Sequence, residues 1–163
     1  MIRHLTLTKI FALLSHLSYP EIFVTILASG HPLPVPEAII FLGLGVVASS
    51  SAGHLIGFLL TAFLAIVTYD LLLYGFGYLG VKAAATVSKS AKSAWKDRYS
   101  GAGDMHIISL IIFSHFIPGW RMANPVIAAG LKIPFRKFII GTLISAAIYP
   151  AVYIFMGFFL PWK

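Results

Sequence analysis

The stretch AIIFLGLGVVASSSAGHLIGFLLTAFLAIVTY, residues 38–69, contains no Lys, Arg, Asp or Glu. A helix needs about 20 apolar residues to cross a bilayer, so this run is too long for one span and too short for two. Ser49–Ser51 and Gly53 interrupt it. The pattern predicts a helix shorter than a full span, followed by a spanning helix after the interruption.

The composition of the whole chain supports a membrane protein. Of 163 residues, 59% are hydrophobic and only 10% are charged, whereas soluble domains carry about 25% charged residues. This excludes an ordinary soluble enzyme and predicts a single membrane domain over residues 1–163. The absence of cysteine excludes disulfides and thiolate metal sites. We interpret Met1–Ser18 as a retained first helix rather than a cleaved signal peptide.

Two further apolar regions complete the layout. Leu55–Gly80 and Phe138–Leu160 are predicted spanning helices, the first with Asp70 inside it. The apolar region around Pro118 and Gly119 is too interrupted for a straight span. Short, interrupted hydrophobic segments at corresponding places in two halves indicate re-entrant elements and a binding site.

The two halves share a short motif. His31, Pro34 and Glu37 align with His115, Pro118 and Arg121 at one common offset. This predicts a first half at about 19–80 and a second at about 104–161, joined by a basic linker at about 82–103. If the linker is cytoplasmic, as the positive-inside rule favours, the two halves cross the membrane in opposite orientations. The expected fold is an all-α integral membrane protein, with an inverted repeat of two opposed re-entrant helical hairpins plus spanning helices.

The net charge of +7 is consistent with this membrane layout. Most Lys and Arg residues mark one membrane face and its anionic headgroups, so nucleic acid is not an expected partner. The linker is either a plain solvated connector or a lipid-binding surface, and the sequence leaves both open. The expected location is the inner or plasma membrane, with several passes, and a homo-oligomer is compatible with the pattern.

Charged residues inside apolar runs are the candidate site. Glu37 is either a simple helix-start residue or an intramembrane carboxylate that takes protons. Arg121 either pairs with an acid or grips a phosphate in two bonds. Asp70 is placed near the bilayer centre by its distance from Gly80, where a carboxylate suits proton coupling or a structural pair.

The histidines and the remaining motifs complete this picture. His31 and His115 are either satisfied polar groups or a proton relay. The chain has neither metal-ligand spacing nor a nucleophile motif, so we expect no metal, no cofactor and no enzyme activity.

Four motifs together resemble a known family. They are Pro34-x-Pro36-Glu37, Asp70-Leu-Leu-Leu-Tyr74-x-x-Gly77, Phe116-Ile-Pro118-Gly119-x-Arg121 and Gly130-x-x-x-Pro134-Phe135-Arg136-x-Phe138. They are similar to the DedA family, the VTT-domain or SNARE-associated membrane proteins, over roughly residues 20–160. The resemblance implies two opposed re-entrant hairpins and translocation of lipids. Bacterial members move undecaprenyl phosphate or phospholipid with the proton-motive force, and eukaryotic relatives are scramblases.

Carried over by residue, the resemblance makes Glu37 and Asp70 the family acids and Arg121 the family arginine. The chain departs from the family pattern at three places. Pro36 stands where the family has Gly before the acid, and His115 stands where it has an arginine six residues before Arg121. Ala28 replaces a further acid, for which Glu21 is the nearest substitute.

We therefore expect a transporter or scramblase for an anionic lipid headgroup, with proton coupling open. The alternative is a proton-coupled ion or small-solute antiporter. A lipid phosphatase and a purely structural subunit are weaker alternatives. The expected transport residues are Glu37, Asp70, His115, Pro118, Gly119 and Arg121, with Glu21, His31, Pro34 and Asn124 in support.

Overall fold

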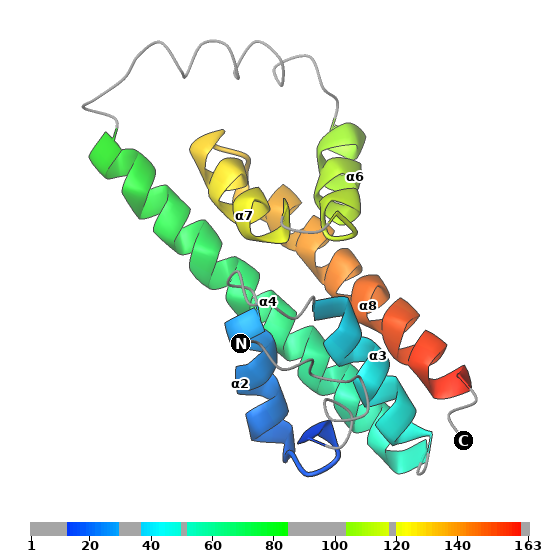
Figure 1. Ribbon diagram of the computed structural model, residues 1–163. Coiled ribbons are helices and arrows are strands. Elements are labelled where there is room, and N and C mark those ends of the chain that lie inside the picture. Colours follow the sequence, from blue (N-terminus) through cyan, green and yellow to red (C-terminus); the bar gives the residue numbers. More distant parts are fainter. Residues whose placement is uncertain (1–12, 30–36, 50–51, 85–103, 118–119, 161–163) are drawn as a thin grey trace, which may run out of the picture. The chain divides into compact units, whose positions relative to one another are not determined.

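The described part of the protein is helical. A computed structural model describes residues 13–29, 37–49, 52–84, 104–117 and 120–160. Its helices are α2 (Tyr19–Ser29), α3 (Glu37–Ala48), α4 (Ala52–Ala84), α6 (Asp104–Ser114), α7 (Trp120–Gly130) and α8 (Phe135–Phe159) (Figure 1). The described residues form no strand, which confirms the all-helical fold class. Residues 1–12 of the predicted first helix at Met1–Ser18 and residues 85–103 of the predicted basic linker lie outside the described residues.

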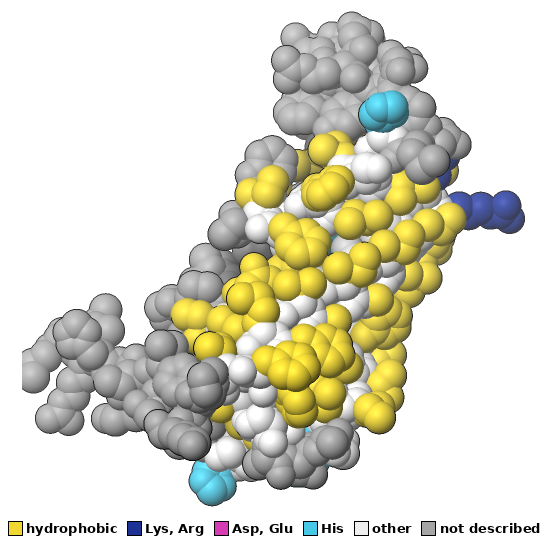
Figure 2. Space-filling model, turned by 90° about the vertical axis from the view of Figure 1, so that its right-hand side faces the viewer, with side chains coloured by type: hydrophobic (Ala, Val, Ile, Leu, Met, Phe, Trp, Pro, Cys, Tyr) yellow, Lys and Arg dark blue, Asp and Glu magenta, His cyan; other side chains and the backbone are white. Residues whose placement is uncertain are grey.

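Two helices are long and apolar enough to cross a membrane. They cover Gly53–Gly80 and Phe135–Phe159, with mean hydropathies of 2.1 and 2.0. At about 1.5 Å per residue they are roughly 42 and 38 Å long, more than the roughly 30 Å hydrocarbon core. Many large apolar side chains on them are exposed, among them Ile56, Phe76 and Phe159. Figure 2 shows apolar side chains over most of the described surface on one face. Both predicted spans are therefore present as helices, and they indicate a membrane protein.

The other helices are half as long. The helices α2, α6 and α7 have 11 residues each and α3 has 12, so each is roughly 16–18 Å long and too short to cross the hydrocarbon core. They contact one another in sequential pairs, α2 with α3 and α6 with α7. The predicted interruption of the long uncharged run is confirmed, because α3 ends at Ala48 and α4 begins at Ala52.

The chain divides into two compact units that do not follow the two halves of the sequence. The first unit comprises Met1–Ile66 and Ala146–Lys163, and the second comprises Val67–Ser145. Each unit therefore contains one pair of short helices, one part of α4 and one part of α8. The predicted halves at about 19–80 and 104–161 within one membrane domain remain a prediction.

The first unit has an apolar core with a close helix crossing. Phe41 is fully buried on α3, and its ring meets that of Tyr149 edge-on with centroids 5.6 Å apart. Gly45 on α3 and Gly157 on α8 lie so close that a Cβ on Gly45 would be 2.9 Å from the Gly157 Cα. Backbone atoms cannot retract like a side chain, so glycine is required at this crossing.

The second unit is held by a cluster around the turn from α7 to α8. Ile111, Ala128, Ile133 and Phe138 form its buried centre. Tyr74 of α4 stacks on Phe138 with ring centroids 4.5 Å apart. The Tyr74 hydroxyl donates a hydrogen bond of 2.8 Å to the Ile133 carbonyl. The turn is therefore fastened to α4 by both a ring contact and a hydrogen bond.

The end of α7 explains why this turn is sharp. Lys132 has a φ of 57°, the left-handed conformation that closes many helices. The amides of Lys132 and Ile133 bond back to the carbonyls of Ala129 and Ala128, each at 3.0 Å. These two bonds form a Schellman motif, after which Pro134 prevents the helix from continuing.

Candidate functional site: a buried Asp–His pair

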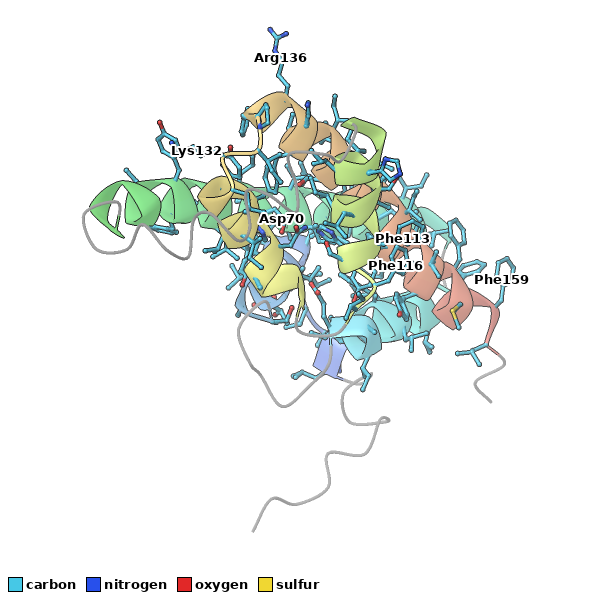
Figure 3. The ribbon with its side chains drawn as sticks, turned by 90° about the horizontal axis from the view of Figure 1, so that it is seen from above. Asp70, Phe113, Phe116, Lys132, Arg136 and Phe159 are labelled. Carbon is cyan, nitrogen blue, oxygen red and sulfur yellow. The ribbon has the colours of Figure 1, made fainter. Side chains whose placement is uncertain are left out.

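A carboxylate and an imidazole meet in the interior of the second unit. The Asp70 Oδ2 and His115 Nε2 atoms are 2.8 Å apart, and neither side chain has any exposed surface. Asp70 lies within the candidate span of α4, and His115 directly follows the last residue of α6. Figure 3 shows Asp70 among the helices, while Arg136 points away from them. Because buried charges are costly unless paired, the two groups stabilise one another here.

The second ring nitrogen of His115 determines where its hydrogen lies. His115 Nδ1 is 2.9 Å from the Ile111 carbonyl oxygen. A carbonyl can only accept, so Nδ1 carries a hydrogen and donates it. The contact between Nε2 and Oδ2 then requires one further proton, which resides either on the imidazole or on the carboxyl. In both arrangements the pair has no net charge, which suits its burial.

The pair also closes the end of α6. Ile111 belongs to the last turn of α6, where carbonyls have no partner within the helix. Its oxygen accepts from His115 Nδ1 at 2.9 Å and from the Ser114 hydroxyl at 2.7 Å. A cation at this position is favoured by the negative end of the helix dipole. His115 thus joins the end of a half-length helix to a buried acid on a spanning helix.

Further buried polar side chains lie in the same unit. Ser114, Asn124, Thr142 and Ser145 are all buried there. The Asn124 Nδ2 and Thr142 Oγ1 atoms have no hydrogen-bond partner among the described residues. An unsatisfied buried donor is expensive and often marks a place where a ligand or a water binds.

Glu37 and Arg121 both lie in the first turn of a short helix, and this position was predicted for Glu37. Glu37 is the first residue of α3 and is half-buried, and Arg121 is the second residue of α7. The described part of Arg121 is its helical backbone. His31, Pro34, Pro118 and Gly119 lie outside the described residues. Their transport roles remain predictions.

Glu21 has a local structural role. Its carboxylate accepts hydrogen bonds from the backbone amide and the hydroxyl of Ser18, both at 2.7 Å. The Ser18 carbonyl in turn accepts from the Ile22 amide at 3.0 Å. This arrangement caps the start of α2. The backbone hydrogen bond from Ser18, followed by its side-chain bond, lowers the pKa of Glu21.

Sequence reasoning named both Asp70 and His115 but did not pair them. It left a structural pair as one alternative for Asp70, and the contact described above is with His115. The available signal was an acid inside a predicted span together with a histidine at the end of a short apolar segment. Their separation of 45 residues belongs to no local motif, so only the tertiary packing brings them together.

The described residues contain no group of three or more His, Asp or Glu side chains that could hold a metal ion.

Comparisons with known proteins support the membrane assignment. A segment of 54 residues is 35% identical to an uncharacterised membrane protein of Buchnera aphidicola from the aphid Acyrthosiphon pisum. The match covers 33% of this chain and 21% of the Buchnera protein. No family model matches the chain, and no solved structure matches it. Together with the two candidate spans, the similarity to that protein indicates a membrane protein.

Proposed function

We propose that the protein is a membrane transporter or scramblase that moves an anionic lipid headgroup, such as that of undecaprenyl phosphate or a phospholipid. The observation that carries the proposal is the start of α7. Arg121 lies in its first turn, at the positive end of the helix dipole, where a cation is unfavourable without an anion nearby. Free amides at such a helix start are ready donors to a phosphate.

Asn124 supports the same assignment. It follows Arg121 by three residues, the spacing of neighbours on one helix face. Its amide nitrogen is buried and has no partner among the described residues. A phosphate oxygen would satisfy this donor, and an arginine can bind the same phosphate in two bonds.

Matching helix crossings support the inverted repeat on which the proposal relies. In the first unit, Gly157 of α8 packs against Leu42 of α3. In the second, a Cβ on Gly77 of α4 would be 2.9 Å from the Val126 Cα of α7. Val126 corresponds to Leu42 by the same offset that relates His115 to His31. Each short helix thus crosses a long helix at an equivalent place, as expected for two re-entrant hairpins.

The motifs that resemble the DedA family favour a lipid over a soluble ion. In this reading Arg121 binds the headgroup phosphate, and Glu37 and Asp70 balance its charge. Pro118 and Gly119 directly precede α7 in the sequence. The linker of residues 82–103 is cytoplasmic in this proposal, and the chain passes the inner membrane several times.

The proposal is tested by reconstitution into liposomes that contain a fluorescent polyprenyl phosphate or an anionic phospholipid. We expect Arg121→Ala to abolish movement of the headgroup between leaflets. Arg136→Ala is the matched control, because Arg136 is exposed at the start of α8, and we expect it to retain wild-type rates. Wild-type flipping by purified, folded Arg121→Ala would refute the lipid assignment.

A proton-coupled ion or small-solute antiporter is the second candidate. The buried Asp70–His115 pair favours it, because the 2.8 Å contact between two ionisable side chains involves no lipid ligand. Proton flux driven by an ion gradient in liposomes of purely zwitterionic lipid would support the antiporter. Flux that requires lipid phosphate and depends on Arg121 would exclude it.

A further inference from the structure

We propose that Asp70 and His115 form a single-proton site, and that occupation of this site holds the end of α6 against α4. The proposal goes beyond headgroup binding at α7. It rests on the hydrogen bonds of the pair and does not depend on which substrate is moved.

The geometry makes the shared proton necessary. The ring of His115 makes two hydrogen bonds, to Asp70 Oδ2 at 2.8 Å and to the Ile111 carbonyl at 2.9 Å. Since both partners are acceptors when Asp70 is ionised, both ring nitrogens must carry a hydrogen. If the proton instead resides on the carboxyl, Nε2 accepts it and Nδ1 still donates. Either arrangement keeps both bonds.

Loss of the proton removes one of the two bonds. A neutral ring with its hydrogen on Nδ1 turns the Nε2 lone pair towards the Asp70 carboxylate. With the hydrogen on Nε2, the Nδ1 lone pair faces the Ile111 carbonyl. Each alternative brings two acceptors together inside a buried site, which is unfavourable. The ring then loses its hydrogen bond either to Asp70 on α4 or to the Ile111 carbonyl in the last turn of α6.

The consequence is a connection between proton binding and helix attachment. The ring of His115 is attached to α6 at Ile111 and to α4 at Asp70, with Phe116 and Ile117 directly following in the chain. When the site is protonated, the end of α6 is fastened to the spanning helix. When the proton leaves at higher pH, this end is released on one side. A site of this kind couples a proton to the attachment of the end of α6 to α4.

The other titratable groups of the unit occupy different places. Those among its described side chains are Tyr69, Tyr74, Tyr78, His106, Lys132, Arg136 and Lys137. Tyr69 is buried next to Asp70 in the chain, and the Tyr74 hydroxyl is bonded to Ile133. His106, Lys132, Arg136 and Tyr78 are exposed, and Lys137 is half-buried. On α7 the charged residue is Arg121, described by its backbone alone.

The first measurement reads the proton directly. Full-length protein with ¹⁵N-labelled histidine is placed in nanodiscs, and the ring nitrogens of His115 are followed by NMR as the pH rises. The His115→Gln spectrum identifies the signal by subtraction. We expect Nδ1 to carry its hydrogen at low pH and one nitrogen to lose it at higher pH. Ring signals that stay constant over the whole range in which the protein remains folded would overturn the proposal.

The second measurement reads the attachment of α6. Hydrogen exchange of residues 107–117 is compared across the same pH range, after correction for the chemical exchange rate. Loss of one ordinary hydrogen bond should accelerate exchange about tenfold. Exchange in α3 of the same sample serves as the internal reference and should show no such step.

Two variants complete the test. In Asp70→Asn the amide can donate to Nε2 while Nδ1 donates to Ile111, so both bonds persist without a shared proton. We expect this variant to lose the pH step in exchange at residues 107–117. His106→Gln changes an exposed histidine of the same helix and should keep the step. A step that persists in Asp70→Asn, or that vanishes in His106→Gln, would assign the proton to another group.

Neither readout involves transport, so this proposal and the proposed function can fail separately. If Arg121→Ala abolishes flipping while wild-type His115 shows no titration, the lipid assignment stands and the proton site is refuted. The reverse result refutes the lipid assignment alone.

Discussion

Each of the two compact units contains a pair of short helices and parts of α4 and α8, but the two interiors differ. The core of the first unit is apolar, with Phe41, Leu44 and Ile154 fully buried, and Ser29 is its buried polar residue among those described. The second unit buries Asp70 and His115 together with Ser114, Asn124, Thr142 and Ser145. Burial of polar groups costs free energy, so their concentration in the second unit is the reason for proposing a functional site there.

The difference separates two kinds of packing. The first unit is held by close backbone contact at Gly45 and Gly157, which needs no polar group. The second unit uses hydrogen bonds that depend on a proton and on the tautomer of one ring. We therefore expect stability to respond to steric changes in the first unit and to pH and charge in the second.

The largest expected effect comes from breaking the buried pair. His115→Leu leaves the Asp70 carboxylate buried without its imidazole, which should lower the free energy of unfolding by about 3–5 kcal/mol. The double variant Asp70→Leu/His115→Leu removes both charges and should recover most of this loss. Chemical unfolding in one detergent measures both. A double variant no more stable than the single one would contradict a charge-based cost.

The matched change in the first unit is Phe41→Ala. Loss of this buried ring should cost a similar amount, about 3–5 kcal/mol. Because no proton is involved, this cost should not vary with pH, whereas the cost of His115→Leu should. Equal pH dependence in the two variants would remove the distinction between the units.

A smaller effect is expected at the glycine crossing. Gly45→Ala places a methyl group against the backbone of α8, which should destabilise the protein by about 1–3 kcal/mol. Gly75→Ala is the control, because a Cβ there meets nothing within 4 Å. Thermal unfolding of both variants separates crowding from helix propensity. Equal losses would show that the close approach of α3 and α8 does not matter.

The hydrogen bond of Tyr74 should contribute about 1 kcal/mol. Tyr74→Phe removes the bond to the Ile133 carbonyl and retains the stack on Phe138. Tyr74→Leu removes both and should cost more. If the two substitutions lower the midpoint of chemical unfolding equally, the ring contact contributes nothing.

The smallest expected effect concerns Glu21 in the first unit. Because its pKa is lower in the folded protein, the stabilisation is present above the ordinary glutamate pKa and is lost as the pH falls through the folded value. Glu21→Gln should therefore differ from the wild type at neutral pH and converge with it in acid. A Tm difference that is constant across this range would argue against the capping role.

Much of the layout follows from the sequence. Ser49–Ser51 and Gly53 interrupt the uncharged run of residues 38–69, and they predict the break between α3 and α4. The apolar run Phe138–Leu160 predicts α8. Glu37 falls at a helix start, as the preceding proline indicated. These features are local, because helix length and helix starts depend on neighbouring residues.

The site could be predicted only as a set of residues. Asp70, His115 and Asn124 were all candidates, since polar groups are rare in this chain. The burial of these three side chains could not be predicted, because it depends on which helices pack around them. The hydrogen bond between Asp70 and His115 could not be predicted either, because the two residues lie 45 positions apart.

The sequence by itself determined that this is an apolar helical protein with two candidate spans and a few charges inside them. The tertiary structure alone decided that α4 and α8 each contribute to both compact units, and that the imidazole of His115 meets Asp70. The reason is physical. Hydropathy is a property of each segment, whereas the choice of partner for a buried charge depends on which helices pack around it.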